Sequence, residues 1–256
     1  MLVDKNSSLF KKLTEELSDD KVIPYINKWL EESPNAGVYE IRDLPYVSRT
    51  KNAKDRHFYP SGDCMKCQRL MYWERMEPKK LIEERTPAST QMIFKIGTMF
   101  HEMLQAWFKS WNELKGYPRC ADNERPIIDE EWNIGGYIDS VLVFPGNDDE
   151  IPIEIKTINS NRFATLKAPL PAHKLQVGCY IMHLDAPFGI VLYVNKDTGE
   201  MKEYKVEPFD MQPTLMRWAD VRMSVANEDI SSLTYGCQRG SKDWERCPAR
   251  NLCFRV

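Results

Sequence analysis

The chain of 256 residues lacks any apolar run long enough to cross a membrane, and its first residues, MLVDKNSSLFKK, lack the apolar core of a signal peptide. It also has no internal repeats and no low-complexity segments. We therefore expect a cytoplasmic protein with no membrane partner. Its length allows one large domain, or one domain with appendages, with a sizeable core.

The chain also lacks a large excess of charge of either sign, because its net charge is −3. This balance argues against a general polyanion binder. The distribution is uneven. Ten acids and one base lie between Asp122 and Glu154, whereas five bases and two acids lie between Cys237 and Val256. An acidic middle beside basic flanks suits a metal site next to a phosphate track, although solvated faces would produce the same pattern.

Hydrophobic periodicity predicts helices that bracket a small central sheet, which places the fold in the α/β or α+β class. The longest expected helix covers 91–114. Its apolar positions keep a period near 3.6 and are Ile93, Ile96, Phe100, Leu104, Trp107, Trp111 and Leu114. Two strand pairs are expected, within 133–157 around a turn at 145–148, and within 188–206 around a turn at 197–199. Further helices are expected at 7–18, 22–33, 64–76, 172–184 and 213–227.

The stretch IPIEIKT, residues 151–157, is an unusual strand. Ile151, Ile153 and Ile155 alternate as in a half-buried strand, while Glu154 and Lys156 share the other face. Such a carboxylate and ammonium often form only a surface ion pair. The function of this strand therefore depends on which groups Glu154 and Lys156 contact.

Asp139 lies in the strand that precedes this one, so a hairpin would bring it close to Glu154. Two neighbouring carboxylates repel each other unless a cation lies between them, and Mg²⁺ and Mn²⁺ prefer carboxylate oxygen. Lys156 would then orient a metal-bound water, or deprotonate it if its own pKa is lowered. The alternative is that Asp139 is a turn or cap residue and the other two charges are incidental.

Two further motifs accompany these residues. His101 lies in GTMFHEML on the long expected helix, and Gln176 and Tyr180 lie four apart in HKLQVGCY, on one helical face. The order G-x-x-x-H, G-x-x-D, E-x-K, Q-x-x-x-Y resembles the RecB-type exonuclease branch of the PD-(D/E)XK nuclease superfamily. The chain departs from the motif in one position, because Ile138 stands where the proline would precede Asp139.

The resemblance implies a restriction-endonuclease-like α/β core, with a small central mixed sheet flanked by helices, and a metal-dependent DNA exonuclease acting on single-stranded ends. In that family the histidine and the two acids bind Mn²⁺ or Mg²⁺ with the help of a carbonyl, the lysine positions water, and the Gln and Tyr hold the lysine and the strand in register. Here this set is His101, Asp139, Glu154, Ile155 through its carbonyl, Lys156, Gln176 and Tyr180.

Seven cysteines in a cytoplasmic chain are not expected to form disulfides. Cys237, Cys247 and Cys253 crowd into the tail, and Cys64 and Cys67 lie upstream. This arrangement resembles the clasp of helicase-associated and CRISPR-associated RecB-like nucleases, in which four cysteines hold a [4Fe–4S] cluster. Zinc is the rival, because four thiolates suit it equally.

The resemblance favours Cys67 over Cys64 as the upstream ligand, because a basic residue follows Cys67 by two positions and an aromatic comes after it. The segment from Cys247 to Cys253, CPARNLC, matches the pattern of that family well. Cys237 departs from the family, since nine residues rather than two separate it from Cys247. The remaining cysteines, Cys120 and Cys179, are interpreted as ordinary buried thiols.

We therefore expect a helical extension and basic loop at 1–60, a nuclease core at 61–236, and the cysteine-rich tail at 237–256. Single-stranded DNA is the expected partner, together with protein partners in a recombination or CRISPR complex. The expected setting is recombination, repair, phage DNA processing or CRISPR adaptation. His173 could also contact a phosphate. Two alternatives are a DNA-end-binding subunit with little cleavage and a zinc-clasped interaction protein. The residues expected to follow the DNA backbone are Arg49, Lys51, Lys54, Arg56 and the arginines of the tail.

Overall fold

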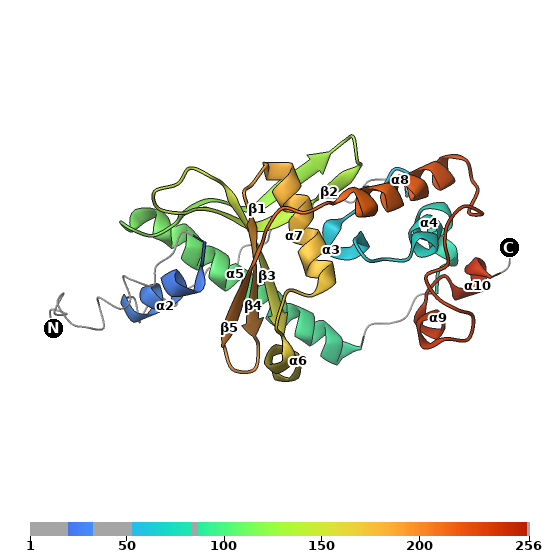
Figure 1. Ribbon diagram of the computed structural model, residues 1–256. Coiled ribbons are helices and arrows are strands. Elements are labelled where there is room, and N and C mark those ends of the chain that lie inside the picture. The colour runs from blue at the N-terminus through green and yellow to red at the C-terminus, as the bar shows by residue number, and fades with distance from the viewer. Residues whose placement is uncertain (1–19, 33–52, 83–86, 255–256) are drawn as a thin grey trace. The chain divides into compact units, whose positions relative to one another are not determined.

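The computed structural model describes residues 20–32, 53–82 and 87–254 (Figure 1). The expected helix at 7–18, and also Arg49, Lys51 and Arg255, lie outside these residues. The chain divides into two compact units. Unit 1 comprises Met1–Asp43, Met92–Arg125 and Tyr137–Pro208, and unit 2 comprises Leu44–Gln91, Pro126–Gly136 and Phe209–Val256. The division expected from the sequence has three contiguous parts, whereas each unit here combines separated stretches of the chain. The three-part division stays a prediction.

The longer helices match the expected ones to within a few residues at each end. They are α2 (Ile23–Glu32), α4 (Gln68–Met76), α5 (Ala88–Ser110), α7 (Pro171–Leu184) and α8 (Gln212–Ala226). Short helical turns complete the set: α3 (Pro60–Asp63), η1 (Pro78–Lys80), η2 (Trp111–Glu113), α6 (Ser160–Thr165), α9 (Lys242–Arg246) and α10 (Arg250–Cys253). No helix in the described ranges combines the length and apolarity that a membrane crossing requires.

One five-stranded sheet runs in the order β1-β2-β3-β4-β5, and flanking helices cover it (Figure 1). Its strands are β1 (Arg119–Asp129), β2 (Ile134–Val143), β3 (Ile151–Ile158), β4 (Gly189–Asn195) and β5 (Met201–Val206). β2 and β3 are antiparallel, β3 and β4 are parallel, and β4 and β5 are antiparallel. The parallel pair needs a crossover, which α6 and α7 supply. The expected α/β class with a small mixed sheet is confirmed.

The strand β1 was not expected from the sequence. Its residues, RCADNERPIID, are mostly polar and do not alternate, because the strand lies at one edge of the sheet and is only partly buried. Glu124 within it has a φ of 52°, in the left-handed region that a side chain makes costly, so the pleat is interrupted there. A polar edge strand of this kind carries almost no periodic signal.

The core of unit 1 lies between one face of the sheet and the helices α2 and α5. Ile153, Ile155 and Leu192 from the central strands pack there against Leu104 and Phe108 of α5. α2 adds aromatic contacts, for example between Trp29 and Trp107, whose ring centroids are 5.0 Å apart.

The apolar stripe expected along 91–114 is only partly correct. Leu104, Trp107 and Trp111 are buried, but Ile93 and Leu114 are 47% and 39% exposed. The buried positions of this stripe lie in its C-terminal half, and the period alone did not show where burial begins and ends.

β3 is buried on both faces, so the half-buried strand expected from its alternation is wrong. Ile151, Ile153 and Ile155 face the core described above, and Pro152 and Glu154 on the opposite face are also buried. The helix α7 covers this second face. A Cβ placed on Gly189 of β4 would lie 2.5 Å from Val177 of α7 and 3.2 Å from Pro152, so helix and sheet approach closely.

Because of this close approach, Gly189→Ala is expected to destabilise the protein by about 1–3 kcal/mol, since the stiff Val177 side chain cannot yield without moving α7. Urea unfolding followed by circular dichroism measures the effect. Gly62→Ala is the matched control, because a Cβ at Gly62 meets nothing within 4 Å. Equal stability of the two variants would show that α7 does not press on β4.

Unit 2 is organised around α4 and α8 and a buried arginine. Arg75 is buried and donates hydrogen bonds to the carbonyls of Met71, Arg56 and His57 at 3.0–3.3 Å. Its guanidinium also lies over the ring of Phe58, 4.1 Å from the centroid. Burial lowers the pKa of Arg75 to about 10, so it remains charged at neutral pH.

Two of the residues expected to follow a DNA backbone already have acidic partners in unit 2. Lys54 Nζ lies 2.7 Å from Glu228, and Arg56 lies 3.4 Å from Glu74 and 3.8 Å from Asp63. These ion pairs compete with phosphate contacts and weaken the case for Lys54 and Arg56 as a backbone track.

Candidate functional site

The site begins where β2 and β3 stop pairing. Their register runs from Leu142–Ile151 to Ser140–Ile153, and the next residue of β2 is Asp139. The Asp139 side chain, rather than the β2 backbone, then accepts a hydrogen bond from the Ile155 amide, with 2.7 Å between N and Oδ2. A carboxylate thus replaces a strand partner at this point and is fixed by the backbone of β3.

His101 reaches the same carboxylate from α5. Its Nδ1 lies 3.5 Å from Asp139 Oδ2. α5 comes close to β3 one turn earlier, where a Cβ on Gly97 would lie 3.2 Å from Thr157 Oγ1, so glycine suits this contact. Burial lowers the pKa of His101, but its hydrogen bond with Asp139 and the Asp139 charge outweigh burial, and the pKa is raised overall.

Glu154 and Lys156 form a direct ion pair on the face of β3 that α7 covers. Glu154 is 1% exposed, and its Oε2 is buried without a hydrogen-bond partner among the described residues. Burial, followed by the charge of Asp139, raises the pKa of Glu154 to about 7. An ionised carboxylate here lacks part of the stabilisation that water would give it.

Lys156 has a pKa above its ordinary value. Burial lowers this pKa, but the charges of Glu154 and Asp139 more than compensate. The alternative in which a lowered pKa makes Lys156 a base is therefore not favoured. A protonated lysine that orients a water or offsets negative charge agrees better with this environment.

Gln176 and Tyr180 lie on one face of α7, and both are buried. Gln176 Nε2 donates to Tyr180 Oη at 2.7 Å, and Tyr180 donates to the Tyr137 carbonyl of β2 at 2.9 Å. The pair thus bonds to the backbone of β2 two residues before Asp139, and not to Lys156 as the resemblance implied. Both side chains are buried, and the role of this pair toward a DNA strand stays a prediction.

Tyr180→Phe is expected to destabilise unit 1 by about 1–3 kcal/mol, because the Tyr137 carbonyl and the Gln176 amide would each lose a partner in a buried place. Thermal and urea unfolding measure this loss. Tyr235→Phe, at a residue that is 47% exposed in unit 2, serves as the control. If Tyr180→Phe unfolds like the wild type, the chain of hydrogen bonds does not hold β2.

Sequence reasoning missed two residues beside the site. Gln105 Nε2 donates to the Asp139 carbonyl at 2.8 Å and to Glu124 Oε1 at 2.7 Å. Burial raises the pKa of Glu124, and the charge of Asp139 adds to this shift. Gln105 follows His101 by four positions, so their shared helical face was a usable signal. Glu124 had none, because its strand was not expected.

The chemistry of the donor set fits a hard divalent ion, since His101 contacts Asp139, the Asp139 charge acts on Glu154, and one buried oxygen of Glu154 lacks a partner among the described residues. Within the described ranges, however, no three His, Cys, Asp or Glu side chains already surround a point that could hold an ion. The Glu154 carboxylate is instead paired with the Lys156 ammonium. The metal set of His101, Asp139, Glu154 and the Ile155 carbonyl therefore stays a prediction.

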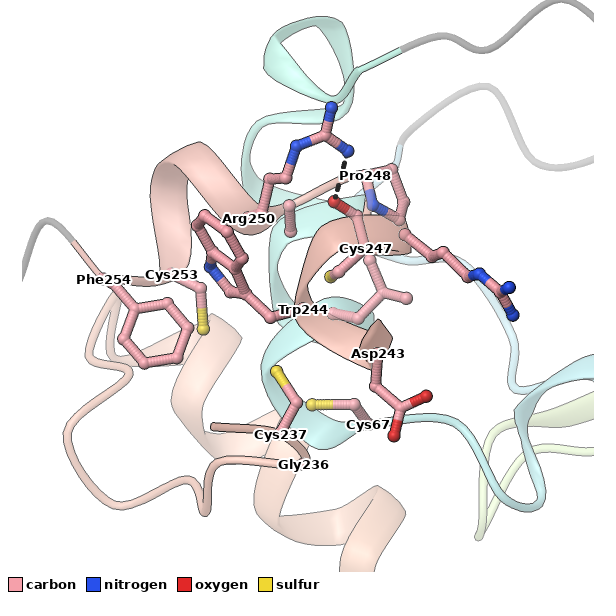
Figure 2. Close-up of a pocket in the computed structure, with 13 residues that line it drawn as sticks. Cys67, Gly236, Cys237, Asp243, Trp244, Cys247, Pro248, Arg250, Cys253 and Phe254 are labelled. Carbon is pink, nitrogen blue, oxygen red and sulfur yellow. Dashed lines mark hydrogen bonds between the residues drawn. The ribbon is translucent and has the colours of Figure 1, made fainter. Parts of the chain in front are cut away.

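In unit 2 the four selected cysteines line one cavity of about 260 Å³, to which the chain contributes the start of α4 and the tail (Figure 2). They are Cys67, Cys237, Cys247 and Cys253. Cys64 does not line it; it is buried, and its carbonyl accepts a hydrogen bond from Arg217 at 3.1 Å. The expected thiols Cys120 and Cys179 are both buried.

Three of the four thiols of this cavity have a raised pKa. Burial raises the pKa of Cys237, Cys247 and Cys253, and neighbouring cysteines raise each of them further. Arg69 fastens the tail, because its guanidinium donates to the carbonyls of Leu233 at 2.9 Å and Cys253 at 3.4 Å. Four thiols that would repel one another as thiolates are a donor set for a thiophilic metal or cluster.

No family model matches the chain, and no curated protein matches it. Among solved structures, SSO0001 is 21% identical, with 91% of this chain and 97% of that one covered and a TM-score of 0.47. An alkaline exonuclease from Laribacter hongkongensis, LHK-Exo, is 14% identical, with 67% and 89% covered and a TM-score of 0.45. LHK-Exo in complex with dAMP is 15% identical, with 67% of this chain and 89% of that one covered and a TM-score of 0.48. The function is therefore inferred from the side chains of this chain.

Proposed function

We propose that the protein is a divalent-metal-dependent deoxyribonuclease that hydrolyses phosphodiester bonds from single-stranded ends. One observation carries this proposal: His101, Asp139, Glu154 and Lys156 gather where β2 and β3 part, and one buried oxygen of Glu154 has no partner among the described residues. A purely structural ion pair would satisfy both oxygens of a buried carboxylate.

In this function His101, Asp139, Glu154 and the Ile155 carbonyl would hold Mn²⁺ or Mg²⁺, and Glu154 would exchange its ammonium partner for the ion. When bound, the ion supplies polarisation of the scissile phosphate and a lowered pKa for a water. The Ile155 amide keeps the Asp139 carboxylate in place. Lys156, protonated, positions the attacking water and offsets the negative charge that develops on the phosphate oxygens.

The residues behind the site keep β2 in position. Gln176 and Tyr180 hold the Tyr137 carbonyl, and Gln105 holds the Asp139 carbonyl. The two contacts bind the carbonyl two residues before Asp139 and the carbonyl of Asp139 itself. They restrict β2 beyond the last residue that pairs with β3. Such support keeps the Asp139 carboxylate within the small tolerance that catalysis requires.

We further propose that Cys67, Cys237, Cys247 and Cys253 hold a [4Fe–4S] cluster that clasps the tail to the start of α4. Their placement around one cavity supports this proposal, and Arg69 and the close contact of Gly236 with Cys67 bring tail and helix together. A Cβ on Gly236 would lie 2.7 Å from Cys67 Sγ, so a larger residue would displace that thiol. Zinc fits the same four thiols, and metal analysis separates the two.

The test is a digestion assay with purified protein and Mn²⁺ on single strands labelled at one end or internally. We expect loss of the end label before the internal label, no cutting of circular single strands, and no activity in EDTA. Cutting of circles would show an endonuclease. Tight binding of ends without turnover would replace the nuclease by a DNA-end-binding subunit.

A further inference from the structure

The connection between α6 and α7 is fastened to β4 and β5 by side chains on one face of the sheet. Tyr204 donates a hydrogen bond to the Leu166 carbonyl at 2.9 Å, and Lys202 Nζ lies 3.3 Å from the same oxygen. The amide of Leu170 donates to Tyr193 Oη at 2.9 Å. These contacts fix the chain just before α7 begins, and with it the first turn of that helix.

His173 in that first turn meets the same tyrosine. Its Nδ1 lies 2.8 Å from Tyr193 Oη, and Tyr193 is 0% exposed. The hydroxyl already accepts from the Leu170 amide, so its single proton needs an acceptor of its own. Among the described residues, His173 Nδ1 is the only other group bonded to this hydroxyl. An unpartnered buried hydroxyl proton is costly, so Tyr193 donates to Nδ1.

This hydrogen bond fixes the tautomer of His173, because an Nδ1 that accepts leaves the ring proton on Nε2. The ring is half-buried, and no hydrogen bond to Nε2 occurs within the described part of the chain. His173 therefore presents a neutral N–H donor with an unused hydrogen-bonding capacity.

Two cations lie near this donor. β3 and β4 pair Lys156 directly with Tyr193, so their side chains share one face of the sheet. Burial, followed by the charges of Lys156 and Arg162, lowers the pKa of His173 to about 4. The imidazole is thus uncharged at neutral pH, and it can lie beside both cations without repelling them.

We propose that His173 binds a non-bridging oxygen of the nucleic-acid backbone through Nε2–H, at the phosphate next to the one placed at Lys156. The inference rests on the proposed function and adds a substrate-positioning residue to it. A neutral, fixed donor adds direction to the attraction that Lys156 and Arg162 provide.

Binding of a fluorescein-labelled single-stranded oligonucleotide, followed by fluorescence anisotropy in EDTA, tests the inference without cleavage. His173→Ala is expected to weaken binding about tenfold, the loss typical of one hydrogen bond to a charged group. His173→Gln, whose amide can replace Nε2–H, is expected to recover most of it. His183→Ala is the matched control, since His183 is exposed near the end of the same helix. Equal affinities of His173→Ala and the control would overturn the inference.

Steady-state cleavage adds a second readout. If His173 only positions the substrate, KM rises about tenfold in His173→Ala while kcat changes much less, and a general loss of structure would lower kcat instead. The two proposals fail differently. A wild type that never cleaves, but whose binding still weakens in His173→Ala, overturns the nuclease alone, whereas unchanged binding in an active nuclease overturns His173 alone.

The tautomer can be observed directly by ¹⁵N NMR, because the chain has only four histidines. The wild type is expected to show His173 as the Nε2–H form at neutral pH. Tyr193→Phe removes the donor to Nδ1, so the signal should move toward a tautomer mixture and DNA binding should weaken. A wild-type Nδ1–H form would contradict the hydrogen-bond assignment.

Discussion

Glu154→Gln is expected to lower Mn²⁺-dependent cleavage by about a thousandfold or more while single-stranded DNA is still bound. Glutamine keeps the size and shape of the side chain but removes the charge that would hold the ion and pair with Lys156. Because Glu154 is buried beneath α7, the substitution does not change the surface that DNA meets. Initial rates on end-labelled strands and anisotropy in EDTA measure the two properties separately.

The control for this variant is Glu200→Gln, at an exposed glutamate in the turn between β4 and β5. It removes the same charge from the chain without touching the site. Lys156→Ala is the companion variant, and it is expected to lose cleavage to a similar degree, since the water and the developing charge would lose their cation. If either site variant digests DNA at the wild-type rate, the group around Asp139 is not the catalytic centre.

Cys247→Ala is expected to abolish the broad absorbance near about 400 nm that anaerobically purified wild-type protein should show, and to lower its melting temperature. Cys247 lines the cavity together with the other three thiols of the clasp, and a cluster with one ligand missing is readily lost. The tail would then be held mainly by Arg69 and by packing. Visible spectra, iron and sulfide determination and thermal unfolding measure these effects.

Cys64→Ala is the matched control, because Cys64 precedes Cys67 by three positions but lies away from the cavity lining. It is expected to keep the colour, whereas Cys67→Ala should lose it. A colourless wild type containing one zinc would keep the four-thiol clasp and replace the iron–sulfur cluster. A wild type with neither metal would show that these four thiols hold no metal clasp.

Much of the fold was predictable because its central elements are strongly periodic. The helix that bears His101, the hairpin that bears Asp139 and Glu154, and the helix that bears Gln176 and Tyr180 all occur where the pattern of apolar residues places them. Residues two apart on a strand share a face, and this rule gave the pairing of Glu154 with Lys156.

Other features depend on contacts between distant segments and were not accessible in this way. β1 is polar and irregular, so neither the strand nor Glu124 could be placed. The burial of Glu154 results from α7 lying over β3, and the same feature makes its carboxylate costly to ionise. The bond between Tyr193 and His173 likewise needed three dimensions, because twenty residues separate them.

The two compact units are interleaved, since each is made from three stretches of the chain and α5, β1 and β2 contribute to both. No single stop codon or protease cut can therefore yield either unit intact. On the ribosome, the first unit lacks β5 until translation has passed residue 206, and the second lacks its last thiol until residue 253 has been added. Nascent chains should thus stay sensitive to proteases until residue 253 has been added.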